Sequence, residues 1–342
     1  MSLLDVKNLE VKFELRKGAV TALRDVSFSL NRGERVGIVG ESGAGKSVAA
    51  FSILNLISRP GKITGGEILF DGQDLSKLSD KALRTIRGNR ISMIFQDPMM
   101  TLNPVLTVGE QMIECLRTHT KMSKAEAKRI ALEKLKLVHI PSPEKRLDQY
   151  PHELSGGMKQ RIIIATALLL SPDIIIADEP TTALDVTIQA EIMDLLQELC
   201  KSQNLALILI THDLGVVSQV TERTIVMYAG RIIEMGPTKE IINDAQHPYT
   251  QGLINALPQQ AVPGGRLSQI PGNMPSLENT PSGCAFHPRC SYATERCRTE
   301  LPGYSPSGGC SVACHLIDEL NKSTDTRNDE LAEKEGGLNN EQ

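Results

Sequence analysis

The feature that most constrains this chain is a glycine-rich stretch, GESGAGKS, at residues 40–47. Its spacing is G-x4-G-K-S/T, and it stands between a short apolar segment, RVGIV, and an apolar stretch of helical character, VAAFSILNLI. A strand, a tight loop and a helix in that order are typical of a phosphate-binding loop. The alternative, a glycine-rich turn with a surface lysine, leaves the flanking strand and helix unexplained.

In such a loop the glycines let backbone N–H groups turn inward around phosphate oxygens, and the helix N-terminus adds partial positive charge. Lys46 is expected to reach the β- and γ-phosphates, and Ser47 to bind Mg²⁺. The residues of this loop that we expect to contact ATP are Gly40, Ser42, Gly43, Gly45, Lys46 and Ser47.

A second group of candidate residues ends the apolar segment IIIADE at residues 174–179. A buried strand would place Asp178 and Glu179 at the carboxyl edge of a sheet, where open α/β sheets bind ligands. Asp178 is expected to hold Mg²⁺, and Glu179 to polarise the attacking water. His212 follows the apolar segment ALILIT in the same way, so a role at the γ-phosphate is preferred to simple packing.

Composition narrows the class of protein. The chain has 342 residues, a formal charge of -4, 3% aromatic residues and no Trp, so it should fold around an aliphatic core. The slight acidity argues against a broad nucleic-acid footprint. No apolar run reaches the ~18 residues of a membrane span, and the N-terminus lacks a signal segment. We therefore expect a cytosolic chain.

Strand and helix patterns alternate along the first two thirds of the chain, which predicts an α/β fold with a mostly parallel sheet. After Gly236 the chain becomes rich in Pro and Gly, and five of its seven Cys lie between Cys284 and Cys314. From Leu316 onward there are eight acids and three bases. We predict that residues 317–342 form a disordered acidic tail.

Further motifs follow the phosphate loop in a fixed order: LSGGMKQR at residues 154–161, IIIADEP, ALD at residues 183–185, and THD. Together they resemble the ATP-binding cassette (ABC) family over about residues 3–245. The resemblance implies a P-loop nucleotide-binding domain over residues 1–236, with a RecA-like core, a β subdomain and a helical subdomain at about 97–170. Residues 237–316 then form an irregular, Cys-rich extension.

The family carries further roles over to matching positions. Ser155, Gly156 and Gly157 reach the γ-phosphate held by a facing subunit, so that two ATP molecules lie between two head-to-tail cassettes. Asp185 contacts the facing subunit. Gln96 senses Mg²⁺, which the resemblance assigns to Ser47, Gln96 and Asp178, and Phe13 stacks on adenine.

The segments QDPMMTLNP, YPHELSGGMKQR, ADEPTTALDVTIQA, HPYTQGLINALP and GCAFHPRCSYATERC are similar to ATPase subunits of dipeptide/oligopeptide importers. This implies a peripheral ATPase at the cytoplasmic face of the inner membrane. It further implies a heterodimer with a second homologous ATPase, two transmembrane permeases, an extracytoplasmic solute-binding protein and no nucleic acid. Nickel or another solute is an alternative cargo.

The clustered Cys predict a metal site, because cytosolic thiols are kept reduced. The spacing itself leaves an iron–sulfur cluster, zinc and a stapled, disulfide-linked tail open. By resemblance to the importer subunits, the ligands of a 4Fe-4S cluster are Cys284, Cys290, Cys297 and Cys314, and Cys310 is an additional thiol.

Two other classes of ABC protein fit the sequence less well. A soluble ABC ATPase of DNA repair or chromosome handling is disfavoured, because the chain has one cassette, no long heptads and no basic stripe. An exporter subunit or translation factor is disfavoured by the Cys-containing extension.

Overall fold

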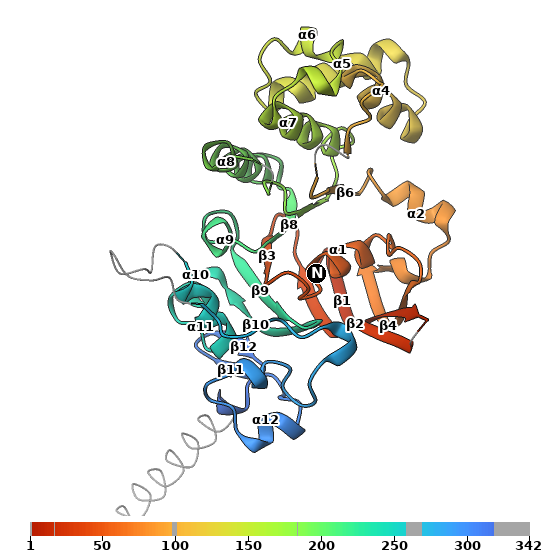
Figure 1. Cartoon of the computed structure of the whole chain (residues 1–342). Helices are drawn as coiled ribbons and strands as arrows, with labels where there is room; N and C mark the ends of the chain where they lie inside the picture. The colour runs from red at the N-terminus through yellow and green to blue at the C-terminus, as the bar shows by residue number, and fades with distance from the viewer. Residues whose placement is uncertain (1, 17, 98–100, 183, 258–268, 318–342) are drawn as a thin grey trace, which may run out of the picture.

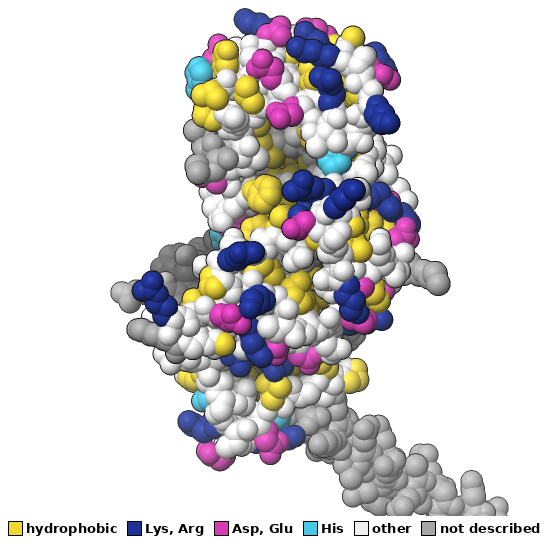
Figure 2. Space-filling model, turned by 90° about the vertical axis from the view of Figure 1, so that its right-hand side faces the viewer, with side chains coloured by type: hydrophobic (Ala, Val, Ile, Leu, Met, Phe, Trp, Pro, Cys, Tyr) yellow, Lys and Arg dark blue, Asp and Glu magenta, His cyan; other side chains and the backbone are white. Residues whose placement is uncertain are grey.

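The computed structural model describes residues 2–16, 18–97, 101–182, 184–257 and 269–317. The predicted acidic tail falls outside these ranges, apart from Ile317. Two sheets with helices around them, and a separate lobe of helices, make up the described part of the chain (Figure 1). The face turned to the viewer in Figure 2 carries basic and acidic side chains intermingled, in keeping with the small net charge.

Among the described residues, eight strands form the larger sheet in the order β11-β12-β10-β9-β3-β8-β7-β6. Strands β6, β7, β8, β3 and β9 run parallel, and β10, β12 and β11 continue the sheet antiparallel. Their bounds are β3 Arg35–Val39, β6 Ile91–Ile94, β7 Ile174–Asp178, β8 Ala206–Thr211, β9 Arg223–Tyr228, β10 Arg231–Pro237, β11 Ser305–Ser307 and β12 Cys310–Val312. The predicted parallel sheet is thus confirmed.

The smaller sheet has the order β2-β1-β4-β5. Its strands are β1 Leu4–Leu15, β2 Gly18–Leu30, β4 Gly61–Phe70 and β5 Gln73–Asp74, all paired antiparallel. Their alternating apolar residues join the strands of the larger sheet in one aliphatic cluster that includes Leu9, Ile38 and Ile208. An aliphatic core is what a chain without Trp requires.

The helices fall into three groups (Figure 1). Flanking the sheets are α1 Lys46–Ile53, η1 Leu75–Lys77, α2 Asp80–Ile86, α8 Val186–Gln203 and α9 Leu214–Val220. A helical lobe at the top contains α4 Val108–His119, α5 Lys124–Leu137, α6 Pro143–Leu147, η2 Pro151–Glu153 and α7 Gly156–Ala167. Toward the C-terminus lie α10 Thr238–Asn243, α11 Pro248–Asn255, η4 Leu277–Asn279, η5 His287–Arg289 and α12 Glu295–Thr299.

The C-terminal extension is less irregular than the sequence predicts. Strand β12 pairs with β10, Glu234 lying opposite Val312, so the extension adds two strands to the edge of the larger sheet. Segments of three residues carry too little alternation to be recognised as strands from sequence. Glu234 also accepts the backbone N–H groups of Gln246 and His247, at 2.8 and 3.1 Å, just before α11 begins.

Candidate functional site

The glycine-rich stretch forms a tight loop between the end of β3 and the start of α1, as predicted. Two of its glycines are required by close approaches. Gly40 has a φ of 152°, and a Cβ there would lie 2.4 Å from the carbonyl oxygen of Met227. Gly45, with a φ of 103° at the N-cap of α1, would bring a Cβ within 2.9 Å of Leu23. Side chains are therefore excluded where the loop turns into the helix.

Lys46 is the buried cation of this loop, with 6% of the residue exposed. Its Nζ donates to the carbonyl oxygens of Gly40 at 2.7 Å and Glu41 at 3.0 Å. Burial lowers the pKa of the Lys46 ammonium, and the nearby carboxylates, Glu179 first, act in the opposite direction. A buried cation beside a turn of backbone N–H groups and a helix N-terminus fits a phosphate ligand.

Ser47 and Asp178 meet behind the loop. The Ser47 Oγ donates to the Asp178 Oδ1 at 3.1 Å, and Asp178 is a buried residue at the end of β7. Burial raises the pKa of Asp178, and the Ser47 hydrogen bond opposes that shift. A hydroxyl and a carboxylate are oxygen donors of the kind that Mg²⁺ prefers beside phosphates, so the pair fits this ion.

Three residues predicted to be catalytic come together around one carboxylate. Glu179 follows β7, and Gln96 Nε2 donates to its Oε2 at 3.0 Å. Nδ1 of His212 lies 3.4 Å from its Oε1. Thr182, which sequence reasoning missed, donates its hydroxyl to Oε2 at 2.9 Å. Glu179 has a φ of 45°, a strained conformation for this residue type that is characteristic of functional sites.

The side chains of Gln96, Glu179 and His212 face a cavity of about 670 Å³. Its wall includes loop residues 40–42 together with Gln96, Glu179 and His212. The remaining wall comes from the C-terminal part of the chain: Leu253, Gly272, Asn273 and Met274. No motif marks the segment 272–274, so sequence reasoning did not place it at the site.

Other residues predicted to contact ATP lie elsewhere. Ser155 is the N-cap of α7 in the helical lobe and accepts the backbone N–H of Met158. Asp185 is the N-cap of α8. A Cβ on Gly156 or Gly157 would contact Leu184 or Ile188 respectively, so the LSGG segment packs beside the start of α8. Neither segment lines the cavity formed with loop 40–42.

Phe13 lies on β1 and is partly buried against the core of the smaller sheet. Its ring atoms approach Gly61, where a Cβ would lie 2.7 Å from Cε1. Phe13 is not among the residues that line the cavity. Its stacking on adenine therefore stays a prediction.

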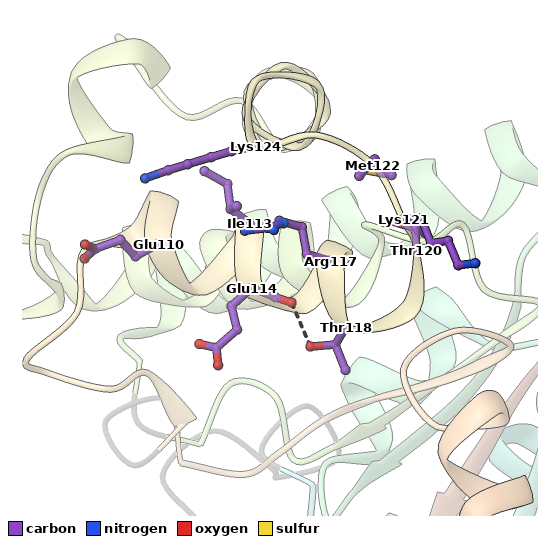
Figure 3. Close-up of a pocket in the computed structure, with 9 residues that line it drawn as sticks. All are labelled: Glu110, Ile113, Glu114, Arg117, Thr118, Thr120, Lys121, Met122 and Lys124. Carbon is purple, nitrogen blue, oxygen red and sulfur yellow. Dashed lines mark hydrogen bonds between the residues drawn. The ribbon is translucent and has the colours of Figure 1, made fainter.

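A separate hollow of about 480 Å³ opens on the helical lobe (Figure 3). It is formed by α4 and the connection to α5, and its charged lining residues are Glu110, Glu114, Arg117, Lys121 and Lys124. Thr118 turns its hydroxyl back to the carbonyl oxygen of Glu114 at 2.8 Å (Figure 3). This hollow shares no residue with the cavity at loop 40–42, so the two are distinct.

Four of the clustered thiols line one small cavity beside the start of α11: Cys284, Cys290, Cys297 and Cys314. Burial, and after it the other three thiols, raises the pKa of Cys284 to about 11. Cys310 lies apart on β12, against Gly236. Among the described residues, no three His, Cys, Asp or Glu side chains are close enough to hold a metal ion as they stand.

Comparison with known proteins identifies the family. Residues 23–182 match the family described as ABC transporter, and residues 233–297 match the oligopeptide/dipeptide transporter C-terminal region. The chain is 50% identical to the dipeptide transport ATP-binding protein DppD of Haemophilus influenzae, over 92% of this chain and 96% of that protein. The chain belongs to the ATP-binding subunits of ABC transporters. The resemblance drawn from its motifs is thereby confirmed, and the protein is an ABC-type ATPase.

Other relatives of this ABC ATPase agree. It is 52% identical to DppD of Bacillus subtilis, over 92% of this chain and 95% of that protein. It is 49% identical to the oligopeptide transport ATP-binding protein OppD of Salmonella typhimurium, over 93% of this chain and 95% of that protein.

Among solved structures, the ATP-binding cassette MJ0796, a dimer bound to ADP and Pi, matches with a TM-score of 0.62 and 33% identity. The match covers 69% of this chain and 98% of MJ0796. It supports the P-loop cassette fold. Within the described ranges, no helix combines the length and the apolar character needed to cross a membrane.

Proposed function

We propose that this ABC ATPase powers the import of di- or oligopeptides. One observation carries the proposal: the similarity to DppD and OppD extends over more than nine tenths of both chains. The similarity therefore includes the C-terminal region matched at residues 233–297. The match to MJ0796, by contrast, covers 98% of that cassette but only 69% of this chain. Nickel or another solute remains the second candidate cargo, and the transport assay below distinguishes it.

The site geometry supports a division of roles in ATP hydrolysis. Lys46 neutralises phosphate charge, while Ser47 and Asp178, with Gln96, would hold Mg²⁺, which supplies further charge neutralisation when bound. The Glu179 carboxylate polarises water, and its hydrogen bonds from Gln96 and Thr182 fix its orientation. The exposed side chain of His212 lies on the same carboxylate, where it can reach a γ-phosphate.

The assembly that we propose is a pair of facing cassettes. Each would bring its Ser155–Gly157 segment and Asp185 to the other's phosphate loop. The facing chain is a second homologous ATPase. The pair docks on two permeases at the cytoplasmic face of the membrane, and an extracytoplasmic solute-binding protein delivers the peptide.

Three regions follow from this function. We assign residues 1–236 to the cassette, residues 237–316 to the extension and residues 317–342 to an acidic tail. The helical subdomain, at about residues 97–170, corresponds to the lobe of α4–α7 (Figure 1).

The intermingled charges of Figure 2 give nucleic acid no continuous basic surface on that face, which favours transport over a role in repair.

The test is uptake by the complete transporter, reconstituted with its permeases, second ATPase and binding protein in proteoliposomes. We expect ATP-dependent accumulation of a labelled dipeptide or oligopeptide, and no accumulation with the Glu179→Gln variant of this chain. Accumulation of Ni²⁺ without peptide uptake would show that the transported solute is nickel and not a peptide. ATP hydrolysis that depends on DNA, with no transport, would contradict the importer function.

A 4Fe-4S cluster at Cys284, Cys290, Cys297 and Cys314 is a second part of the proposal. Four thiols on one cavity are the donor set that such a cluster uses. Burial raises the pKa of the Cys284, Cys290 and Cys314 thiols, so cluster binding must release protons from them, and it must also draw the four side chains closer together. The cluster would then tie the segment that contains Cys284, Cys290 and Cys297 to Cys314, near the end of the extension. Zinc is the alternative metal.

For the cluster we predict a difference between two Cys variants. Anaerobically purified protein should contain about four iron and four sulfide ions per chain. Cys284→Ser should lose most of both, whereas Cys310→Ser should keep them, because Cys310 lies outside the thiol-lined cavity. Iron, sulfide and zinc analysis with visible absorption measures this. Colourless wild-type protein with stoichiometric zinc would favour the alternative metal.

A further inference from the structure

Arg289 connects the Cys-containing extension directly to the phosphate loop. It ends η5 and precedes Cys290, and its side chain is only 4% exposed. One terminal nitrogen donates to Glu41 Oε2 at 2.6 Å and the other to Glu41 Oε1 at 3.0 Å. This is the paired geometry in which Arg binds a carboxylate most strongly. Glu41 is the second residue of the loop at 40–47.

The same guanidinium also holds a second wall of the cavity beside loop 40–42. Its Nε donates to the carbonyl oxygen of Pro271 at 2.8 Å. The next residues, Gly272, Asn273 and Met274, line that cavity together with Gly40, Glu41 and Ser42. One buried side chain from the extension is thus bonded on both sides of the cavity.

The surroundings make this connection rigid. The backbone N–H of Glu41 donates to the hydroxyl of Tyr249 at 2.8 Å. The rings of Tyr228, Tyr249 and Phe286 pack edge to face, with centroids 4.7 to 5.4 Å apart. Arg289 also lies within 3.4 Å of the Tyr228 hydroxyl. A packed aromatic group of this kind transmits displacement instead of absorbing it.

Electrostatics gives the pair a second role. Glu41 places a carboxylate in a loop that must receive phosphate. Two negative charges within one loop repel each other strongly where water is excluded. The carboxylate is close enough to raise the pKa of Lys46, although burial and two other carboxylates act on that pKa more strongly. With Arg289 paired to it, the carboxylate is neutralised and held in a fixed position.

We propose that Arg289 is a positioning residue for the nucleotide site, through which the C-terminal extension sets the affinity of the cassette for ATP. It fixes the Glu41 end of the phosphate loop and cancels the charge of Glu41. The inference rests on the proposed role of loop 40–47 in binding ATP. Lys46→Ala tests that role separately.

The full chain is titrated with a fluorescent ATP analogue, and its ATPase rate is measured over a range of ATP concentrations. We expect Arg289→Gln to raise the Kd and the KM at least about tenfold, from the loss of two charged hydrogen bonds. The kcat should stay within about threefold, because the groups around Glu179 are untouched. The control is Arg298→Gln, which makes an equal charge change at an exposed ion pair in the same region. It should leave the Kd, the KM and the kcat unchanged.

A double-mutant cycle separates positioning from a merely structural role. If Arg289 acts through Glu41, Arg289→Gln should have little further effect on the Kd in the Glu41→Gln background. Arg289→Lys, which keeps the charge, should recover part of the affinity. An equal loss of affinity in both backgrounds, or an unchanged Kd in Arg289→Gln, would overturn the inference. Lys46→Ala that still binds ATP normally would instead overturn the site assignment.

Discussion

Lys46→Ala should weaken ATP binding at least about a hundredfold, on the basis of two or more lost hydrogen bonds to charged phosphate oxygens. In the structure the ammonium is already buried in the loop and donates hydrogen bonds to the carbonyl oxygens of Gly40 and Glu41. When ATP binds, the ammonium can therefore exchange these neutral carbonyl acceptors for charged phosphate oxygens. Equilibrium titration with a fluorescent ATP analogue measures the loss.

The control for this variant is Lys136→Ala. Lys136 is an exposed lysine on α5 in the helical lobe that pairs with an exposed Glu144, so its removal takes the same charge from a part of the chain outside loop 40–47 and β1. We expect its affinity for ATP to match wild type. Thermal unfolding of both variants should show that Lys46→Ala stays folded. A folded Lys46→Ala protein with unchanged affinity would mean that ATP does not bind at this loop.

Much of the site could be predicted from sequence because its parts are local. The turn at Gly40 and Gly45 and the cation at Lys46 are adjacent along the chain, and each has its own chemical signature. The meeting of Ser47 with Asp178 follows from one further rule, that parallel strands present their carboxyl ends at one edge. Strands β3, β8 and β7 are neighbours in the sheet, which brings Glu179 and His212 together.

Contacts between distant segments could not be predicted in this way. Arg289 is 248 residues from Glu41, and nothing near either residue indicates its partner. Strand β12 is recognisable only because β10 offers it a free edge, and Thr182 only because the chain turns back onto Glu179. The reverse holds for Ser155 and Asp185. Their motifs are easily recognised in the sequence, but the contacts predicted for them require a second chain.

Glu179→Gln should reduce ATP hydrolysis by about two to four orders of magnitude, the usual contribution of a general base. The amide keeps the size of the side chain and can still accept hydrogen bonds from Gln96 and Thr182. It cannot take a proton from water. ATP binding should therefore survive, and the assembled transporter should retain nucleotide between closed cassettes.

Two measurements test this expectation: steady-state phosphate release, and the nucleotide that stays bound after gel filtration of the reconstituted complex. Glu222→Gln is the matched control, since Glu222 is an exposed carboxylate paired with Arg35 near the opposite end of the larger sheet. It should hydrolyse ATP at the wild-type rate and retain no nucleotide. If Glu179→Gln also hydrolyses at the wild-type rate, another group accepts the proton. Loss of ATP binding in Glu179→Gln would instead give the carboxylate a structural role, because Gln96, Thr182 and His212 would then depend on its charge for their positions.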